Sequence, residues 1–414
     1  MIEDYVTMLR RYCLEHYDDH LLGLAYAIAG QCFYNEYVFD ESDAERAAVD
    51  ALHDRLNGTE ARLSDIVLYA CYRPLYTHEK AGEYSASMKG MDSGVNELLK
   101  HQVDDPAREE VLKTQIKAVG RIDNDVSVKV RKQYEENPYP RWQSFGLLDA
   151  SPDGNAGDKP GDLLLIAGCG TGKQIFQSRF DDPHSEIVAV DLSRASLAYA
   201  MRKVAELELE NVTFYQADIL ELRELLNLQD GRLFDRIECT GVLHHMEDPL
   251  AGWQVLTDVL KPGGRMLVGL YSSFARRNIV AVRKFIAEKG FASDAAGIRA
   301  CRAALRNLSD ADDMAGVVRG SDFYTMSTCR DLLFHVQEHR FTIKQIENAL
   351  EELGLEFDGF EIPDAGIVHG YKRMFIEDPE MKKLDNWHNL ERNNPYIFAG
   401  MYQFYAKKPI VNEK

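Results

Sequence analysis

The stretch Leu163-Leu-Leu-Ile-Ala-Gly168-Cys-Gly170-Thr-Gly172, followed shortly by Glu186-Ile-Val-Ala-Val-Asp191, decides the fold of this chain. Its opening run of apolar residues suits a strand that is buried on both faces of a parallel sheet. Glycines directly after such a strand let the backbone turn sharply and let a ligand approach it closely. The second apolar run predicts another strand, and the acid that ends it can accept hydrogen bonds from both hydroxyls of a ribose. We therefore predict strand, glycine loop, helix, strand and acid, which is half of a nucleotide-binding α/β sheet.

The residues of the loop distinguish between three classes of nucleotide-binding protein. A dinucleotide fingerprint would need a glycine at the position of Lys173. A phosphate-binding P-loop ends in Gly-Lys followed by a hydroxyl residue that holds magnesium, and Gln174 has no hydroxyl. The remaining pattern is G-x-G-x-G with Asp191 in register. A glycine turn without a ligand is the alternative, and the position of the acid argues against it.

Composition limits the classes of partner. The chain has 414 residues, of which 45% are hydrophobic and 28% charged, and this is typical of a soluble globular protein with two or three domains. A net charge of −19 repels nucleic acid and anionic membranes, so we expect neither as a partner. The seven cysteines form no C-x-x-C pair, which favours reduced thiols over disulfides or zinc. The start of the chain lacks a basic region before an apolar one, so we expect no secretory signal and a cytoplasmic location.

The first part of the chain is predicted to be an α-helical domain over residues 1–125, with a second domain over 126–414. Asn124 is a good cap for a helix that ends near Glu136. The hexad Asn137-Pro-Tyr-Pro-Arg-Trp142 then forbids helix and predicts an extended, stiff segment. The aromatic rings of Tyr139 and Trp142 and the guanidinium of Arg141 suit either a rigid linker or one wall of a pocket. Residues 151–160 are predicted to be a loop that is rich in glycine, proline and aspartate.

Beyond Asp191, further strands and helices alternate along the chain. Ser193 is placed to cap a helix up to about residue 207, and strands are predicted over 212–218, 234–240 and 265–271. The segment Lys261-Pro-Gly-Gly264 predicts a turn before the last of these strands. This order predicts a right-handed, doubly wound, mostly parallel sheet with its ligands beyond the carboxyl ends of the strands. Asp218 and the amide that follows it could hold the edge of an adenine, or Asp218 could cap the next helix.

The C-terminal third of the chain is predicted to interrupt the sheet and then complete it. Helical runs predict an inserted cap at about 274–342, a helix that begins after Thr342, and final strands at 355–362 and 396–406, the last as an antiparallel edge. His335 and His339 would share one face of a helix, which is a metal-ligand spacing. The sequence suggests no third ligand, so we expect polar groups of a substrate pocket and no metal site.

Several short motifs resemble the successive motifs of class I S-adenosylmethionine-dependent methyltransferases. They are Ala-Gly-Cys-Gly-Thr-Gly (167–172), Val-Asp-Leu-Ser (190–193), Gln-Ala-Asp (216–218), Gly-Val-Leu-His-His-Met (241–246) and Leu-Lys-Pro-Gly-Gly (260–264). Residues 134–142 and 322–341 also resemble a bacterial branch whose members carry helical domains ahead of the catalytic part. The resemblance implies an α/β fold with a seven-stranded Rossmann-like sheet. One departure is Ile166, which stands where the family usually has an acid that orders the glycine loop.

The resemblance also assigns roles to residues of this chain. It implies S-adenosyl-L-methionine as the cofactor, with the expected contacts Gly168, Cys169, Gly170, Gly172, Asp191, Leu192, Asp218, Ile219 and Thr240. Because imidazole titrates near neutrality, His244 or His245 is expected to contact or deprotonate the acceptor, together with Tyr271. The candidates for substrate binding are Tyr139, Arg141, Trp142, Tyr324 and His335.

The function expected from the sequence is transfer of a methyl group from S-adenosylmethionine to an acceptor. A small molecule and a protein side chain both remain open as acceptors. The alternative is a non-catalytic protein that binds the cofactor or acts as a scaffold with a degenerate methyltransferase fold. The intact glycines and both acids favour the enzyme.

Overall fold

The computed structural model describes residues 2–58, 61–143, 161–309 and 313–410; the loop expected at 151–160 lies outside these ranges. The chain divides into two units. The helical unit consists of Met1–Thr114 and Val282–Phe334, and the sheet unit consists of Gln115–Ala281 and His335–Lys414. We expected instead a boundary at residue 125 and an insertion that belongs to the second domain. The difference arises because the inserted helices pack with the N-terminal ones.

The sheet unit contains an eight-stranded sheet of order β1-β4-β3-β2-β5-β6-β8-β7 within the described residues. All neighbouring strands from β1 to β6 are parallel, whereas β8 is antiparallel to both β6 and β7. This is the doubly wound α/β fold predicted from the sequence. The strands are β1 (Lys117–Val119), β2 (Leu163–Ala167), β3 (Glu186–Asp191), β4 (Val212–Ala217), β5 (Phe234–Thr240), β6 (Leu260–Leu270), β7 (Glu356–Phe360) and β8 (Tyr402–Lys407).

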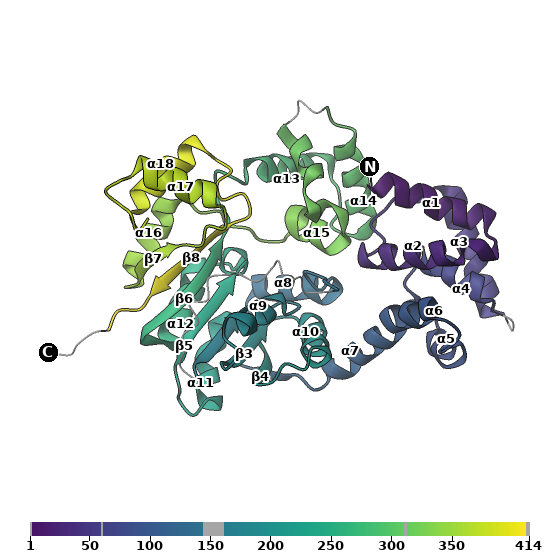
Figure 1. Ribbon diagram of the computed structural model, residues 1–414, viewed down its shortest axis with the longest axis horizontal. Helices are drawn as coiled ribbons and strands as arrows, with labels where there is room; N and C mark the ends of the chain where they lie inside the picture. Colours follow the sequence, from purple (N-terminus) through teal and green to yellow (C-terminus); the bar gives the residue numbers. More distant parts are fainter. Residues whose placement is uncertain (1, 59–60, 144–160, 310–312, 411–414) are drawn as a thin grey trace. The chain divides into compact units, whose positions relative to one another are not determined.

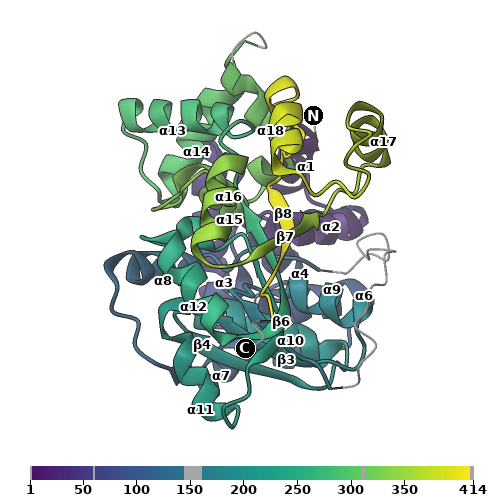
Figure 2. The ribbon, with the colours of Figure 1, turned by 90° about the vertical axis from the view of Figure 1, so that its left-hand side faces the viewer.

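Helices cover both faces of this sheet. Figure 2 shows the strands with α12 (Pro249–Val259) on one side and with α9 (Lys173–Asp181) and α10 (Arg194–Glu206) on the other. Beyond the β7 edge lie the helices that follow the inserted segment, which appear yellow-green in Figure 1. Strand β2 is buried along its whole length, as expected for a central strand with helices on both faces. The remaining helices of this unit are α8 (Asp125–Glu136), α11 (Leu225–Leu228), α16 (Ile343–Glu352), α17 (Ala365–Met374) and α18 (Leu384–Asn393).

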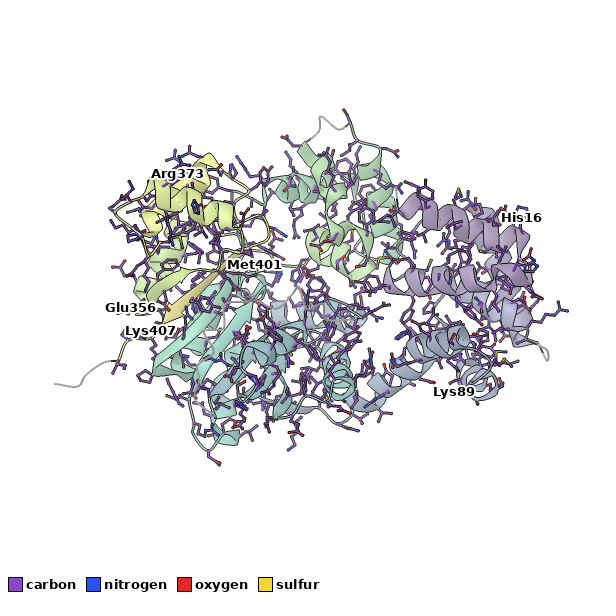
Figure 3. The ribbon with its side chains drawn as sticks, in the orientation of Figure 1. His16, Lys89, Glu356, Arg373, Met401 and Lys407 are labelled. Carbon is purple, nitrogen blue, oxygen red and sulfur yellow. The ribbon has the colours of Figure 1, made fainter. Side chains whose placement is uncertain are left out.

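Three details of the sheet differ from the sequence prediction. It has eight strands where seven were expected, because β1 from the predicted helical region pairs with β4 in parallel. Strand β7 forms the edge of the sheet, and the antiparallel strand β8 lies between β6 and β7; Figure 3 shows the paired residues Glu356 and Lys407 next to each other. The predicted turn at 261–264 is wrong, because these residues lie inside β6, which begins at Leu260. The pairing of β6 with β5 has a register shift at this point.

Helix starts in the sheet unit follow the caps predicted from the sequence. The Asn124 side chain accepts hydrogen bonds from Val126 N and Ser127 N at the start of α8, both at 3.0 Å. Ser193 caps α10 and Thr342 caps α16 through a capping box with Gln345. A side-chain oxygen at such a position satisfies backbone N–H groups that have no partner inside the helix.

The helical unit has its own hydrophobic core, formed by N-terminal helices. In the described ranges, no helix of either unit combines the length and apolar content that a membrane span requires. The helices of this unit are α1 (Ile2–His16), α2 (Leu22–Tyr34), α3 (Asp43–Asn57), α4 (Leu63–Ala70), α5 (Ala81–Met88), α6 (Ser93–Leu99), α7 (Asp105–Lys113), α14 (Ala295–Arg306) and α15 (Met326–Phe334), and α13 (Arg277–Lys289) runs across the boundary between the units.

A buried ion pair joins the inserted segment to the N-terminal helices. The Arg302 Nη2 atom on α14 lies 2.7 Å from Glu3 Oε2 on α1, and both side chains are almost fully buried. The same guanidinium donates to the backbone oxygen of Val38 at 2.9 Å. A buried charge needs such partners to offset its desolvation. The insertion is therefore part of the helical unit and not a cap that folds on the sheet alone.

Candidate active site

The glycine loop between β2 and α9 has a backbone that only glycine adopts without strain. Gly168, Gly170 and Gly172 have φ angles of +79°, +52° and +87°. A Cβ atom at Gly170 would lie 2.7 Å from the backbone oxygen of Tyr139, which is closer than real Cβ atoms come. The loop is therefore shaped by glycine at these positions and is in direct contact with the Pro-rich hexad.

Asp191, the acid at the end of β3, holds this loop. Its Oδ2 atom accepts a hydrogen bond from Gly170 N at 2.9 Å, and its Oδ1 atom accepts one from Ser193 N at 2.8 Å. Burial raises the pKa of this carboxyl to about 6, although the hydrogen bonds from Ser193 and Gly170 favour the charged form. One carboxylate thus ties the glycine loop to the start of α10.

The N-terminus of α10 is fully capped by side-chain oxygens, and one of them comes from α8. Glu135 accepts hydrogen bonds from Arg194 N at 2.6 Å and from Ala195 N at 3.3 Å. Ser193 Oγ accepts from Ser196 N at 3.1 Å. Ser193 N also bonds to Asp191, so the backbone N–H groups of residues 193–196 all have partners. The negative charge of Glu135 is stabilising at this helix N-terminus. The sequence analysis did not predict the role of Glu135, because its partners are distant backbone atoms.

The hexad supports the glycine loop through Trp142. The indole Nε1 of Trp142 donates to Thr171 O at 3.1 Å, and its ring packs edge-on against Phe176 with centroids 4.8 Å apart. Only 6% of Trp142 is exposed. This side chain supports the loop from inside the protein, as the rigid-linker interpretation of the hexad requires. Tyr139 stacks on Tyr134 of α8 at 6.3 Å, and Arg141 is half-buried in the same segment.

Asp218, the acid at the end of β4, makes the capping contact that was one of its two predicted roles. Its Oδ1 atom accepts from Leu220 N at 3.0 Å at the start of a 3-10 helix, Ile219–Glu224. Asp218 is 3% exposed, and the neighbouring Ile219 and Cys169 are also buried. Leu192 contributes its backbone oxygen to Gln216 Nε2 at 2.9 Å.

Thr240 at the end of β5 faces α9. Its Oγ1 atom donates to Gln174 Oε1 at 3.4 Å, and Gln174 Nε2 in turn donates to Glu238 Oε2 at 2.7 Å. Burial raises the pKa of Glu238, while hydrogen bonds from Ser178 and Gln174 favour its charged form. Gln174, which stands where a P-loop has its hydroxyl residue, therefore links α9 to β5.

The two histidines that follow β5 have different surroundings, although they are adjacent in a short 3-10 helix, Leu243–His245. His244 is fully buried, and within the described residues neither of its ring nitrogens has a hydrogen-bond partner. Burial, followed by the neighbouring His245, lowers the pKa of His244 well below its usual range, so its ring is neutral at physiological pH. His245 Nδ1 donates to the backbone oxygen of Gln337 at 2.7 Å, which places the lone pair of the neutral ring on Nε2.

A column of rings connects these histidines to the end of β6. The Tyr271 ring lies tilted against His244 with centroids 3.9 Å apart, and His245 stacks on His335 at 3.5 Å. The guanidinium of Arg276 lies 3.6 Å above the Tyr271 ring and pairs with Glu338 at 2.6 Å. The structure therefore brings the three predicted catalytic residues together with the predicted substrate residue His335. Arg276 and Glu338 belong to the same cluster and were not predicted.

The 335–341 segment holds this cluster in place, and it is not helical. Helix α15 ends at Phe334, so the expectation that His335 and His339 share a helix face is wrong. The segment instead bonds to distant backbone: His339 N donates to His244 O at 2.7 Å, and Phe341 N donates to Tyr271 O at 2.8 Å. No sequence pattern indicates these bonds, because each joins the segment to backbone that lies far away in the chain.

Tyr324, the remaining predicted substrate residue, belongs to the helical unit. Its hydroxyl donates to Val318 O at 2.8 Å, and its backbone oxygen accepts from the side-chain amide of Asn35. These contacts give Tyr324 a structural role within that unit.

Comparison with known proteins gives a match over the region that carries this site. Residues 159–308 match the family model described as a methyltransferase domain. This part of the chain is similar to methyltransferase domains. It contains the glycine loop, both acids and the two histidines.

The other similarities of this chain cover only parts of each protein. An uncharacterized protein of Synechococcus is 29% identical over 49% of either chain. A ubiquinone biosynthesis O-methyltransferase of Alkalilimnicola ehrlichii is 29% identical over 27% of this chain and 42% of its own. The solved structure of PKMT2 from Rickettsia typhi with AdoHcy is 16% identical over 61% of this chain and 49% of its own, with a TM-score of 0.44. The chain thus spans about half or less of the length of these relatives.

Proposed function

We propose that the chain is an S-adenosylmethionine-dependent methyltransferase. One observation carries the proposal: the Asp191 carboxylate holds the Gly170 amide at the end of β2, inside a region that matches a methyltransferase domain. A ribose with two hydroxyls requires an accepting carboxylate beside a closely approachable backbone, and this loop provides both. The chemistry of the donor and acceptor set therefore fits the nucleoside part of the cofactor.

Each residue of the proposed cofactor site has a defined task. Asp191 would accept from the ribose hydroxyls, and the glycine loop would admit the amino-acid end of the cofactor. Asp218 keeps a second carboxylate oxygen beside the one that caps Ile219–Glu224, and this oxygen can accept from an exocyclic amine. Trp142 and Glu135 hold the loop and α10 in position.

The cofactor would supply a methyl group already activated on a sulfonium, so the protein mainly aligns the acceptor and excludes water. We assign contact with the acceptor to His245 and a supporting role to His244. His244 is sealed between Tyr271 and His245, whereas the Nδ1 atom of His245 is held by the Gln337 backbone oxygen, which fixes the orientation of its ring. Small molecules and protein side chains both offer nucleophiles that carry a proton, so this chemistry admits either class as the acceptor.

Titration calorimetry with S-adenosylhomocysteine tests the proposal. Wild-type protein should bind in the micromolar range, and Asp191→Ala should abolish binding. Asp258→Ala is the matched control, because this acid lies on α12 and pairs with Arg223 at the surface. Failure of the wild-type protein to bind would refute the proposed function. A crystal structure with the same ligand would then show which groups face its sulfur.

A further inference from the structure

The sheet unit contains a buried carboxylate that the proposed cofactor site does not use. Glu391 on α18 is fully buried, and its Oε1 atom accepts hydrogen bonds from Ser272 Oγ and from Tyr402 Oη, both at 2.6 Å. Ser272 and Tyr402 are fully buried as well, and all three residues belong to the sheet unit. Among the residues that the structure describes, the Oε2 atom of Glu391 has no hydrogen-bond partner. The carboxylate therefore directs both of its bonds through one oxygen.

The two bonds have the length of charge-assisted hydrogen bonds. A hydroxyl that donates to an ionised carboxylate approaches it to about 2.5–2.7 Å. Burial raises the pKa of Glu391, while the hydrogen bonds from Ser272 and Tyr402 favour its charged form. A buried charge needs such bonds to offset its desolvation, so the two hydroxyls and the carboxylate are held together strongly.

Ser272 connects this carboxylate to the turn that follows β6. Its hydroxyl donates its proton to Glu391, and the same oxygen accepts from Phe274 N at 3.1 Å and from Ala275 N at 3.2 Å. These three bonds use the donor and both lone pairs of the hydroxyl. The backbone oxygen of Ser272 accepts from Arg276 N at 3.1 Å. By fixing the orientation of the hydroxyl, Glu391 therefore fixes the shape of this turn.

The same turn holds part of the histidine cluster, which consists of the adjoining rings of His244, His245, Tyr271 and His335. The Arg276 guanidinium, at the end of the turn, lies 3.6 Å over the centroid of the Tyr271 ring. Ser273 N donates to Phe341 O, and Phe341 N donates to Tyr271 O, both at 2.8 Å. A change in the turn would therefore move both the cation over Tyr271 and the backbone beside it.

We propose that Glu391 is a positioning residue, which sets the Tyr271 ring and the Arg276 guanidinium through the Ser272 hydroxyl. Ser272 directly follows Tyr271 in the chain, so a displacement of the Ser272 backbone also displaces the attachment of the Tyr271 ring. The role of Glu391 in catalysis rests on the proposed function, because it assumes that the histidine cluster serves methyl transfer. The structural link itself does not depend on that assumption.

Amide hydrogen exchange of the full-length protein without cofactor tests the link. Glu391→Leu removes the accepting oxygen from the Ser272 hydroxyl. Exchange at the Arg276 and Phe341 amides should become about tenfold faster, because a hydrogen bond to a charged group is lost and the turn opens more often. Glu391→Gln keeps an accepting oxygen, so these two amides should exchange within about threefold of the wild-type rate.

Tyr402→Phe is the matched control, because it removes the other hydroxyl that donates to Glu391 and leaves the Ser272 bond in place. The Arg276 and Phe341 amides should exchange as in the wild type. Ser272→Ala should speed their exchange at least as much as Glu391→Leu does. The double variant should show no change beyond that of Ser272→Ala, because both substitutions break the same bond.

Asp378→Ala separates release of Ser272 from a general loosening of α18. The Asp378 carboxylate accepts from Lys383 N at 2.9 Å directly before this helix, and it makes no bond to Ser272 among the contacts described here for that hydroxyl. Its loss should loosen the start of α18 and leave the Arg276 and Phe341 amides unchanged.

The Arg276 Nε–H signal in nitrogen-15 spectra gives a second readout. In the wild type, the Tyr271 ring current should shift this signal upfield, because the guanidinium lies over the ring. The shift should be lost in Glu391→Leu and kept in Glu391→Gln and Tyr402→Phe. Wild-type exchange and an unchanged arginine signal in Glu391→Leu would overturn the proposal.

Equal changes in Tyr402→Phe or Asp378→Ala would overturn it as well. If Glu391→Leu does not fold, the contrast between Ser272→Ala and Tyr402→Phe decides in the same way. Calorimetry of the wild-type protein with S-adenosylhomocysteine reports separately on the proposed function, since its failure would leave the exchange rates and the arginine signal to decide the role of Glu391.

Discussion

Replacing Asp191 by asparagine tests how one carboxylate holds the glycine loop and the proposed cofactor. Asp191 accepts from Gly170 N and from Ser193 N through different oxygens. Asparagine offers one accepting oxygen, so one of these two N–H groups loses its partner. A hydrogen bond to a charged group contributes about 1.5–3 kcal/mol. We therefore expect Asp191→Asn to weaken S-adenosylhomocysteine binding by about 10- to 100-fold through the loop alone.

The pH profile of binding distinguishes this carboxylate from others. The pKa of Asp191 is about 6, and only the ionised form accepts hydrogen bonds with both oxygens. Wild-type affinity should fall about tenfold for each pH unit below pH 6, since protonation competes with binding. Asp191→Asn should show little change over the same range, because its amide does not titrate.

The assay is calorimetry between pH 5 and pH 8 at constant ionic strength. Asp258→Asn should follow the wild-type profile, because this acid lies on α12 and pairs with Arg223 at the surface. The reasoning is refuted if Asp191→Asn binds within threefold of the wild type at pH 7.5. It is also refuted if wild-type affinity is level from pH 5 to pH 7.5.

Three further predictions concern backbone strain, a buried ion pair and pH. Gly170→Ala should abolish S-adenosylhomocysteine binding and lower thermal stability by more than about 1 kcal/mol, because its Cβ would lie 2.7 Å from Tyr139 O; thermal shift and calorimetry measure this. Glu3→Gln should destabilise the helical unit by about 3–5 kcal/mol, since it leaves the buried charge of Arg302 without its partner; urea unfolding would show an earlier transition. Burial raises the pKa of Asp191 to about 6, so the folded state holds this proton more tightly than the unfolded state. The free energy of unfolding, measured with urea, should therefore fall by up to about 3 kcal/mol as the pH rises from 4 to 6 in the wild type but not in Asp191→Asn.

Local sequence patterns were sufficient for the central strands and for three helix starts in the sheet unit. The apolar run Leu163–Ile166 was recognised as a buried strand, and β2 is buried throughout. Asn124, Ser193 and Thr342 cap the helices that they were expected to cap. These features depend on residues within a few positions of one another, so the sequence carries them directly.

The arrangement of the site required the folded chain. Strand β1 has three residues and shows no strand pattern of its own, and it joins the sheet only because β4 offers a parallel edge. His335 and His339 have a helical spacing, yet their segment is not helical and bonds instead to the backbone of Tyr271 and His244. Pairing with a distant partner overrides a local pattern when it satisfies buried N–H groups.

The sequence by itself determined the sheet, the left-handed glycine loop and the two acids that end its neighbouring strands. Each follows from side-chain size, backbone freedom or alternation over a short stretch. Only the tertiary structure decided that the insertion folds with the N-terminal helices, that Glu135 caps α10, and that the 335–341 segment holds the histidines. These facts depend on the free energy of burying charges and N–H groups against partners far away in the chain, which no local pattern records.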